Sequence, residues 1–123
     1  MKLMNIIYTN NMTESVAFYE AIGLQPTQPG SIDAWWNVLT LGDAEVALHW
    51  NGDEPLPEPS SRLELHFTLP DSELDKTWAD IQNKGLLPGS PIEMLDGVGR
   101  YFWLTDPDGM KVQFNGISGS GQE

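Results

Sequence analysis

The spacing of apolar residues predicts a helix near the amino terminus. From Asn11 the chain reads NMTESVAFYEAIGL, in which apolar residues recur every three or four positions. Asn11 and Glu14 resemble a capping box, and Gly23 is a typical residue for ending a helix. The apolar stripe consists of Met12, Val16 and Tyr19, with Phe18 and Ile22 beside it.

A second helix is predicted from Asp71, where the sequence reads DSELDKTWADIQNKGL. Asp71 or Ser72 is expected to cap its amino end, and Gly85 is expected to end it. Its buried stripe is expected to comprise Leu74, Trp78 and Ile81.

The other apolar runs are short, rich in aromatic and β-branched residues, and separated by Gly, Pro and Asp turns, which is typical of strands. They cover residues 3–8, 35–41, 44–50, 62–69, 100–105 and 110–114. The order strand, helix, then strands occurs twice, and each helix is followed by Gly-Leu, one further residue and Pro. We therefore predict an α+β chain forming one domain from two repeated units, 1–52 and 62–116, with a connector at 53–61 and a flexible tail at 117–123.

Composition narrows the possible partners. Eighteen acidic and six basic residues give a formal charge of −12, which disfavours nucleic acids and anionic membranes as partners. No run approaches the roughly 20 apolar residues of a membrane-spanning helix, and the first residues do not resemble a signal peptide. The chain has no cysteine, so disulfides and thiolate sites are excluded. We expect a soluble, cytoplasmic protein.

The repeated βαβββ order, the helix ending Phe18-Tyr19 and Gly23-Leu24, the run LELHFTL and the closing DPDG turn resemble the vicinal oxygen chelate superfamily. This superfamily contains glyoxalase I, extradiol dioxygenases and the fosfomycin and bleomycin resistance proteins. The resemblance covers residues 3 to 115. It implies tandem units whose curled mixed sheet surrounds a cavity, with the helices outside, and it implies a homodimer.

In metal-dependent members of this superfamily, four cavity-facing positions hold His or Glu ligands. The resemblance places these positions near Met4 and Ala47 and at Glu64 and Gln113. A thioether, a methyl group and an amide are poor substitutes for imidazole or carboxylate around a divalent ion. We therefore expect no metal and no cofactor, and interpret Gln113 as a side chain that hydrogen-bonds a ligand or, alternatively, as a solvated strand residue.

The two histidines follow two of these positions by two residues, so strand alternation places them on the same faces. His49 follows Ala47, and His66 follows Glu64. We interpret both histidines as polar groups that contact a ligand. A displaced metal site made of His49, Glu64 and His66 remains an alternative.

Tryptophan is unusually frequent, with five in 123 residues. If Leu39 and Leu41 pack beneath a helix, alternation places Trp36 on the cavity face, and the same reasoning places Tyr101 and Trp103 there. Flat aromatic walls favour a planar, aromatic small-molecule ligand. Trp35 and Trp50 are expected in the core or in a subunit contact, and Trp78 in the core of its helix.

Three functions remain open from the sequence. The first is a metal-free protein that sequesters a planar aromatic molecule, as the antibiotic-binding resistance members do. The second is an enzyme, either a metal-dependent lyase, isomerase or dioxygenase or a metal-free catalyst with Glu64 as its base. The third is a module whose aromatic surface contacts another protein.

Overall fold

The structure is a computed structural model that describes residues 3–58, 63–86, 91–95 and 99–117. The chain divides into two compact units. Unit 1 comprises Met1–Glu58 together with 106–108, and unit 2 comprises Pro59–Thr105 together with Gly109–Glu123. Each is described by itself. No helix in the described ranges is long and apolar enough to cross a membrane.

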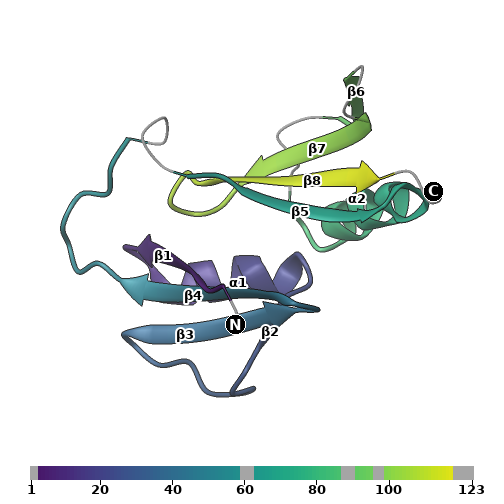
Figure 1. The fold of residues 1–123 in the computed structure, drawn as a ribbon. Coiled ribbons are helices and arrows are strands. Elements are labelled where there is room, and N and C mark those ends of the chain that lie inside the picture. Colours follow the sequence, from purple (N-terminus) through teal and green to yellow (C-terminus); the bar gives the residue numbers. More distant parts are fainter. Residues whose placement is uncertain (1–2, 59–62, 87–90, 96–98, 118–123) are drawn as a thin grey trace. The chain divides into compact units, whose positions relative to one another are not determined.

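Unit 1 contains one helix and a four-stranded mixed sheet (Figure 1). Its elements are β1 (Asn5–Thr9), α1 (Met12–Ala21), β2 (Gln25–Pro26), β3 (Trp36–Leu41) and β4 (Ala44–Trp50). The strand order is β1-β4-β3-β2, in which β1 and β4 are parallel and the other pairs are antiparallel. The helix contacts β2, β3 and β4, so it covers one face of this sheet.

Unit 2 repeats the arrangement. Its elements are β5 (Leu65–Pro70), the short 3₁₀ helix η2 (Asp71–Glu73), α2 (Leu74–Asn83), β6 (Glu93–Leu95), β7 (Gly99–Thr105) and β8 (Lys111–Ile117). The strand order is β5-β8-β7-β6, with β5 parallel to β8. The prediction of a duplicated α+β fold with mixed sheets is confirmed.

Each unit has its own apolar core on the helix side of its sheet. Alternate residues of the strands point into it, as period-2 patterning requires. In unit 1 the fully buried side chains include Val16, Tyr19, Leu24, Leu39, Val46 and Leu48. In unit 2 they include Leu74, Ile81, Phe102, Leu104 and Val112. Phe114 stacks between Phe102 and Phe67, with ring centroids 5.2 and 5.4 Å apart, and it anchors β8.

A buried polar cluster fixes the start of α1. The Tyr19 hydroxyl donates to Asp106 Oδ2 at 2.7 Å, and the hydroxyls of Thr9 and Ser15 lie 2.7 Å apart. Ser15 also donates to Asp108 Oδ2 at 3.2 Å. Thr9, Ser15 and Asp106 are all buried. The closing turn of the sequence is therefore bonded to the first helix by groups that have lost their water.

The helix ends match the sequence prediction in part. The Asn11 side chain caps α1 by accepting from the backbone N–H of Glu14 at 3.2 Å. Gly23 and Gly85 follow the two helices with φ of 116° and 86°, a region that favours glycine. The predicted cap of the second helix is wrong, because α2 is preceded by the 3₁₀ turn and has no side-chain cap.

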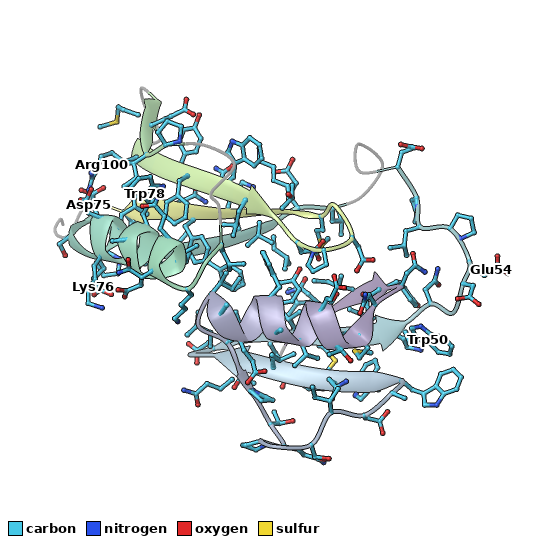
Figure 2. All side chains as sticks on the ribbon, turned by 180° about the vertical axis from the view of Figure 1, so that it is seen from behind. Trp50, Glu54, Asp75, Lys76, Trp78 and Arg100 are labelled. Carbon is cyan, nitrogen blue, oxygen red and sulfur yellow. The ribbon has the colours of Figure 1, made fainter. Side chains whose placement is uncertain are left out.

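Asp71 does not cap α2 because its side chain is bonded to another residue. Its carboxylate accepts two hydrogen bonds of 3.1 Å from the Arg100 guanidinium, which also bonds Asp75 on α2. Figure 2 shows Arg100 and Asp75 together beside this helix. These bonds raise the pKa of Arg100, and the hydrogen bond from Arg100 lowers the pKa of Asp75. The fork of Arg100 ties β7 to the helical segment.

Several sequence predictions need correction. The short strands β2 and β6 were not located, because two or three residues carry no measurable alternation. Trp35 is 61% exposed and so does not fill the core of unit 1, and Leu41 is 40% exposed. Trp78 is only half-buried. Of the predicted tail, Ile117 ends β8 and 118–123 lie outside the described residues, as do residues 59–61 of the connector.

Candidate functional site

Each sheet has one face that its own helix does not cover, which we call its open face. On unit 1 this face carries an aromatic group built from three strands. His49 of β4 is paired with Tyr8 of β1 on one side and with Trp36 of β3 on the other. The His49 ring lies 5.0 Å from that of Tyr8 and 5.9 Å from that of Trp36. Its Nδ1 lies 2.9 Å from the carbonyl oxygen of Trp50.

Close to these rings the open face is apolar. Ile6 and Tyr8 are each 50% exposed, and Trp36 is 38% exposed. Ala47 is fully buried beneath its neighbours and offers only a methyl group. An apolar face with half-exposed rings is a suitable surface for stacking a planar molecule.

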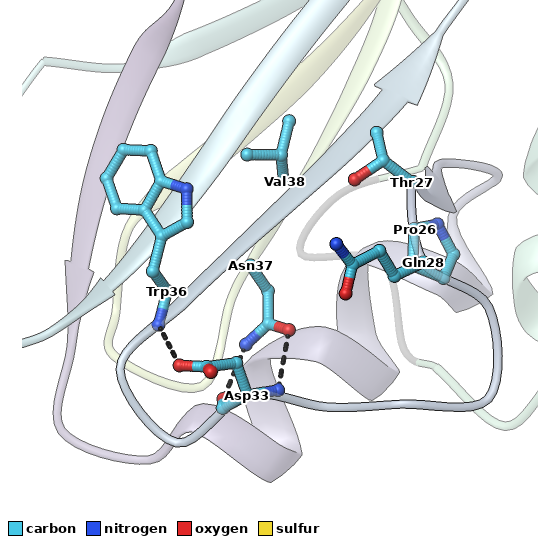
Figure 3. A pocket seen from close by; sticks show the side chains of 7 residues that line it. All are labelled: Pro26, Thr27, Gln28, Asp33, Trp36, Asn37 and Val38. Atoms are coloured by element: carbon cyan, nitrogen blue, oxygen red, sulfur yellow. Dashed lines mark hydrogen bonds between the residues drawn. The ribbon is translucent and has the colours of Figure 1, made fainter.

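A hollow of about 310 Å³ adjoins this face at the loop before β3 (Figure 3). Asp33 shapes it by accepting from the backbone N–H groups of Trp35 and Trp36 at 2.8 and 3.1 Å. Asn37 closes the same turn with two bonds to the Asp33 backbone. The loop thereby holds the start of β3, and the Trp36 ring lines the hollow. Its other lining residues are Pro26, Thr27, Gln28 and Val38.

The open face of unit 2 is polar and is organised as a chain of hydrogen bonds. His66 Nε2 lies 2.9 Å from Glu64 Oε1, and His66 Nδ1 lies 3.1 Å from Asn115 Nδ2. The Gln113 amide nitrogen donates to Asn115 Oδ1 at 2.8 Å. Strand pairing explains the contacts, because His66 of β5 is in register with Gln113 of β8. We call Glu64, His66, Asn115 and Gln113 the open-face network.

Aromatic and charged side chains flank this network. Trp103 of β7 is in register with Gln113, and Tyr101 with Asn115. The Lys111 ammonium lies 5.4 Å from the centre of the Trp103 ring and 3.9 Å from Glu64 Oε1. The hydrogen bond with His66, helped by the charge of Lys111, lowers the pKa of Glu64 below its ordinary value.

The structure therefore places the predicted site residues in two groups. Trp36 and His49 lie on the open face of unit 1, and the others lie on the open face of unit 2: Glu64, His66, Tyr101, Trp103 and Gln113. Sequence reasoning missed Tyr8 and Asn115. Alternation would have found both, since Tyr8 lies in a predicted strand and Asn115 is two residues beyond Gln113.

The donors at the superfamily's four ligand positions do not suit a divalent ion. Met4 and Ala47 offer no oxygen or nitrogen from their side chains, and Gln113 offers an amide. Glu64 is the one carboxylate, and His66 already holds one of its oxygens. Within the described ranges no three His, Asp or Glu side chains are grouped to hold a metal. The alternative set of His49, Glu64 and His66 remains a prediction.

Comparisons with known proteins agree with this architecture. The profile of the glyoxalase/bleomycin resistance protein/dioxygenase superfamily matches residues 3–114. The chain therefore belongs to this superfamily. A search of curated proteins gives no match.

Similar solved structures include proteins with different activities. A bleomycin-binding protein complexed with bleomycin is 19% identical, with a TM-score of 0.72 over 95% of this chain and 98% of that one. A fosfomycin resistance protein from Mesorhizobium loti is 17% identical, with a TM-score of 0.71 over 95% and 91%. A lactoylglutathione lyase from Agrobacterium tumefaciens is 15% identical, with a TM-score of 0.68 over 97% and 93%. At these identities the likeness establishes the fold alone.

Proposed function

We propose that this protein binds a planar aromatic small molecule without a metal ion. We call Trp103 and Tyr101 of unit 2, and Trp36, Tyr8 and His49 of unit 1, the open-face aromatics. The ligand stacks on rings of this set and is hydrogen-bonded by the open-face network of unit 2, mainly at Gln113. The three rings of unit 1 form a stacking surface of their own. The bleomycin complex of a protein with the same fold gives this proposal a precedent.

One observation carries the proposal. The position expected for a metal ligand in β8 holds Gln113, and this residue is bonded into a network of two amides, an imidazole and a carboxylate. Such a network offers directional hydrogen bonds beside an aromatic wall, which is the usual combination in small-molecule sites. Its two amides offer little to a divalent ion, and its carboxylate and imidazole are already bonded to each other.

The alternative of a metal-free enzyme with Glu64 as general base has less support. A base that works near neutral pH needs a pKa raised towards 7, whereas the contacts of Glu64 lower its pKa. Its side chain is also 48% exposed, so little burial opposes that effect.

A fluorescence titration tests the proposal. Planar antibiotics, bleomycin among them, are added while tryptophan emission is recorded for the wild type, for Trp103→Phe and for the control Trp35→Phe. We expect at least one compound to quench the emission, and Trp103→Phe to weaken its binding while Trp35→Phe does not. If no compound alters the emission, or if both variants bind it like the wild type, the proposal is wrong.

A cytoplasmic location and a homodimer remain predictions. Sedimentation velocity at micromolar concentration tests the homodimer. A mass of about twice that of the 13.7 kDa chain is expected, and the mass of a single chain would contradict the prediction.

A further inference from the structure

The Glu64 carboxylate determines the donor and the acceptor of every hydrogen bond in the open-face network. The Glu64 carboxylate, when ionised, only accepts hydrogen bonds, so the His66 nitrogen 2.9 Å from it carries the hydrogen. In a neutral imidazole the second ring nitrogen, Nδ1, is then an acceptor. The Asn115 atom 3.1 Å from Nδ1 must therefore be the amide nitrogen.

The same reasoning extends to Gln113. With its nitrogen directed at His66, Asn115 turns its oxygen towards Gln113, and this oxygen requires a donor. The Gln113 amide nitrogen supplies it at 2.8 Å. The carbonyl oxygen of Gln113 thus remains as the free end of the network. Among the residues that the structure describes, none donates a hydrogen bond to this oxygen.

Lys111 supplies an ammonium group on this face, near the Glu64 carboxylate. Lys111 is held over the Trp103 ring and close to Glu64, through contacts of 5.4 and 3.9 Å. Trp103 itself is in register with Gln113. A planar molecule on the Trp103 side of the face would therefore meet an aromatic wall and, at its edge, the Gln113 oxygen.

We infer that Gln113 selects ligands carrying an N–H or O–H donor on the edge of a planar ring, and that Asn115 is the positioning residue that imposes this choice. The inference rests on the proposed function, because it names the chemistry recognised by the same site. A ligand with an acceptor at that edge would face a second acceptor. Rotating the Gln113 amide to suit it would break the bond to Asn115. In either case about one hydrogen bond is lost, which lowers the affinity of the ligand roughly fivefold.

The first test needs no ligand. Nitrogen-15 NMR of the ring of His66 in mildly alkaline buffer distinguishes the two neutral tautomers. We expect the hydrogen on Nε2, with Nδ1 unprotonated. A hydrogen on Nδ1 would reverse the whole network and overturn the inference, whatever the protein binds.

The second test uses two probes of matched shape, indole with an N–H donor and benzofuran with an oxygen in its place. Their affinities are measured by NMR titration for the wild type, for Gln113→Leu and for the control Gln82→Leu on the exposed side of α2. We expect the wild type and the control to bind indole roughly fivefold more tightly, and Gln113→Leu to lose this preference.

The outcomes separate the two proposals. Equal binding of both probes to the wild type would overturn the donor selection while leaving the planar-ligand site intact. A preference for indole that survives in Gln113→Leu would also overturn the role of Gln113. If neither probe nor any planar antibiotic binds, the proposed function itself fails, and the tautomer measurement still decides the direction of the network.

Discussion

The protein contains two polar networks of similar chemistry in different surroundings. In unit 1 the hydroxyls of Ser15 and Tyr19 meet the carboxylates of Asp106 and Asp108, and Ser15 and Asp106 are buried. In unit 2 the open-face network joins residues that are half-buried or exposed, with 43% of the His66 side chain and 48% of the Glu64 side chain accessible. Both networks join side chains from distant parts of the sequence.

Burial gives the two networks different consequences. A donor without its acceptor costs about 1 to 3 kcal/mol when it is buried, but an exposed donor turns to water instead. Breaking the network of unit 1 should therefore lower the free energy of unfolding. The open-face network contributes little to folding, so its members are available to exchange partners with a ligand.

The largest expected effect follows from removing the buried carboxylate. Asp106→Ala leaves the Tyr19 hydroxyl and the backbone N–H of Asp108 without this acceptor. Two such losses should lower the free energy of unfolding by roughly 3 kcal/mol. Urea denaturation measures this, with Asp43→Ala in the exposed β3–β4 turn as the control. A loss no larger than that of the control would mean that the buried network does not stabilise unit 1.

The next prediction concerns Asn115→Leu, a substitution in the accessible open-face network rather than in the buried network. Because Asn115 links His66 to Gln113 on an accessible face, we expect the free energy of unfolding to change by less than about 1 kcal/mol. Indole affinity should fall roughly fivefold, since Gln113 loses the partner that orients it. Parallel urea and NMR titrations check both. A large loss of stability with unchanged affinity would remove the distinction between the two networks.

Substitutions of Trp103 and Trp36 compare how much the aromatic rings of the two open faces contribute to ligand affinity. Each presents a partly exposed ring, and Trp103 additionally supports Lys111. An aromatic pair contributes about 0.5 to 1.5 kcal/mol beyond burial, so Trp103→Leu and Trp36→Leu should each weaken a planar ligand about two- to tenfold. Calorimetric titration against Trp35→Leu as the control tests this. A ligand that depends on Trp35 alone would contradict the assignment of both faces.

The smallest expected effect concerns Glu64. Its folded pKa is lowered, so the contribution of its ionised form to stability is present above the unfolded pKa and is lost as the pH falls through the folded value. Carbon-13 NMR of the carboxyl group should show a midpoint below the ordinary value, and His66→Leu should move it upwards. The urea midpoint should barely respond, because the side chain is half-exposed. An unchanged carboxyl midpoint in His66→Leu would show that this hydrogen bond is not the cause.

The sequence predicted the repeated fold well because its signals are local. Alternation marked the longer strands, and it also placed Phe102 and Leu104 towards the core with Trp103 on the other face, as the structure has them. The helix stops at Gly23 and Gly85 were predictable because positive φ favours glycine.

The features that the sequence did not predict depend on contacts between residues far apart in the chain. The cap predicted at Asp71 failed because Arg100, 29 positions later, bonds its carboxylate. Alternation places Asn115 on the same face as Gln113, but its contact with His66 at 3.1 Å depends on the register of β5 and β8. The buried hydrogen bond between Tyr19 and Asp106 joins residues 87 positions apart, so no local sequence pattern predicts it.

Ligand affinity measured with and without a chelator tests the central claim most directly. A planar compound that quenches tryptophan emission is titrated into the protein in buffer, then in buffer with EDTA, then after adding back zinc, nickel, manganese or iron(II). Binding through Gln113, Asn115 and the open-face aromatics predicts the same affinity in all cases. Loss of binding in EDTA and its return with one of these ions would contradict the account.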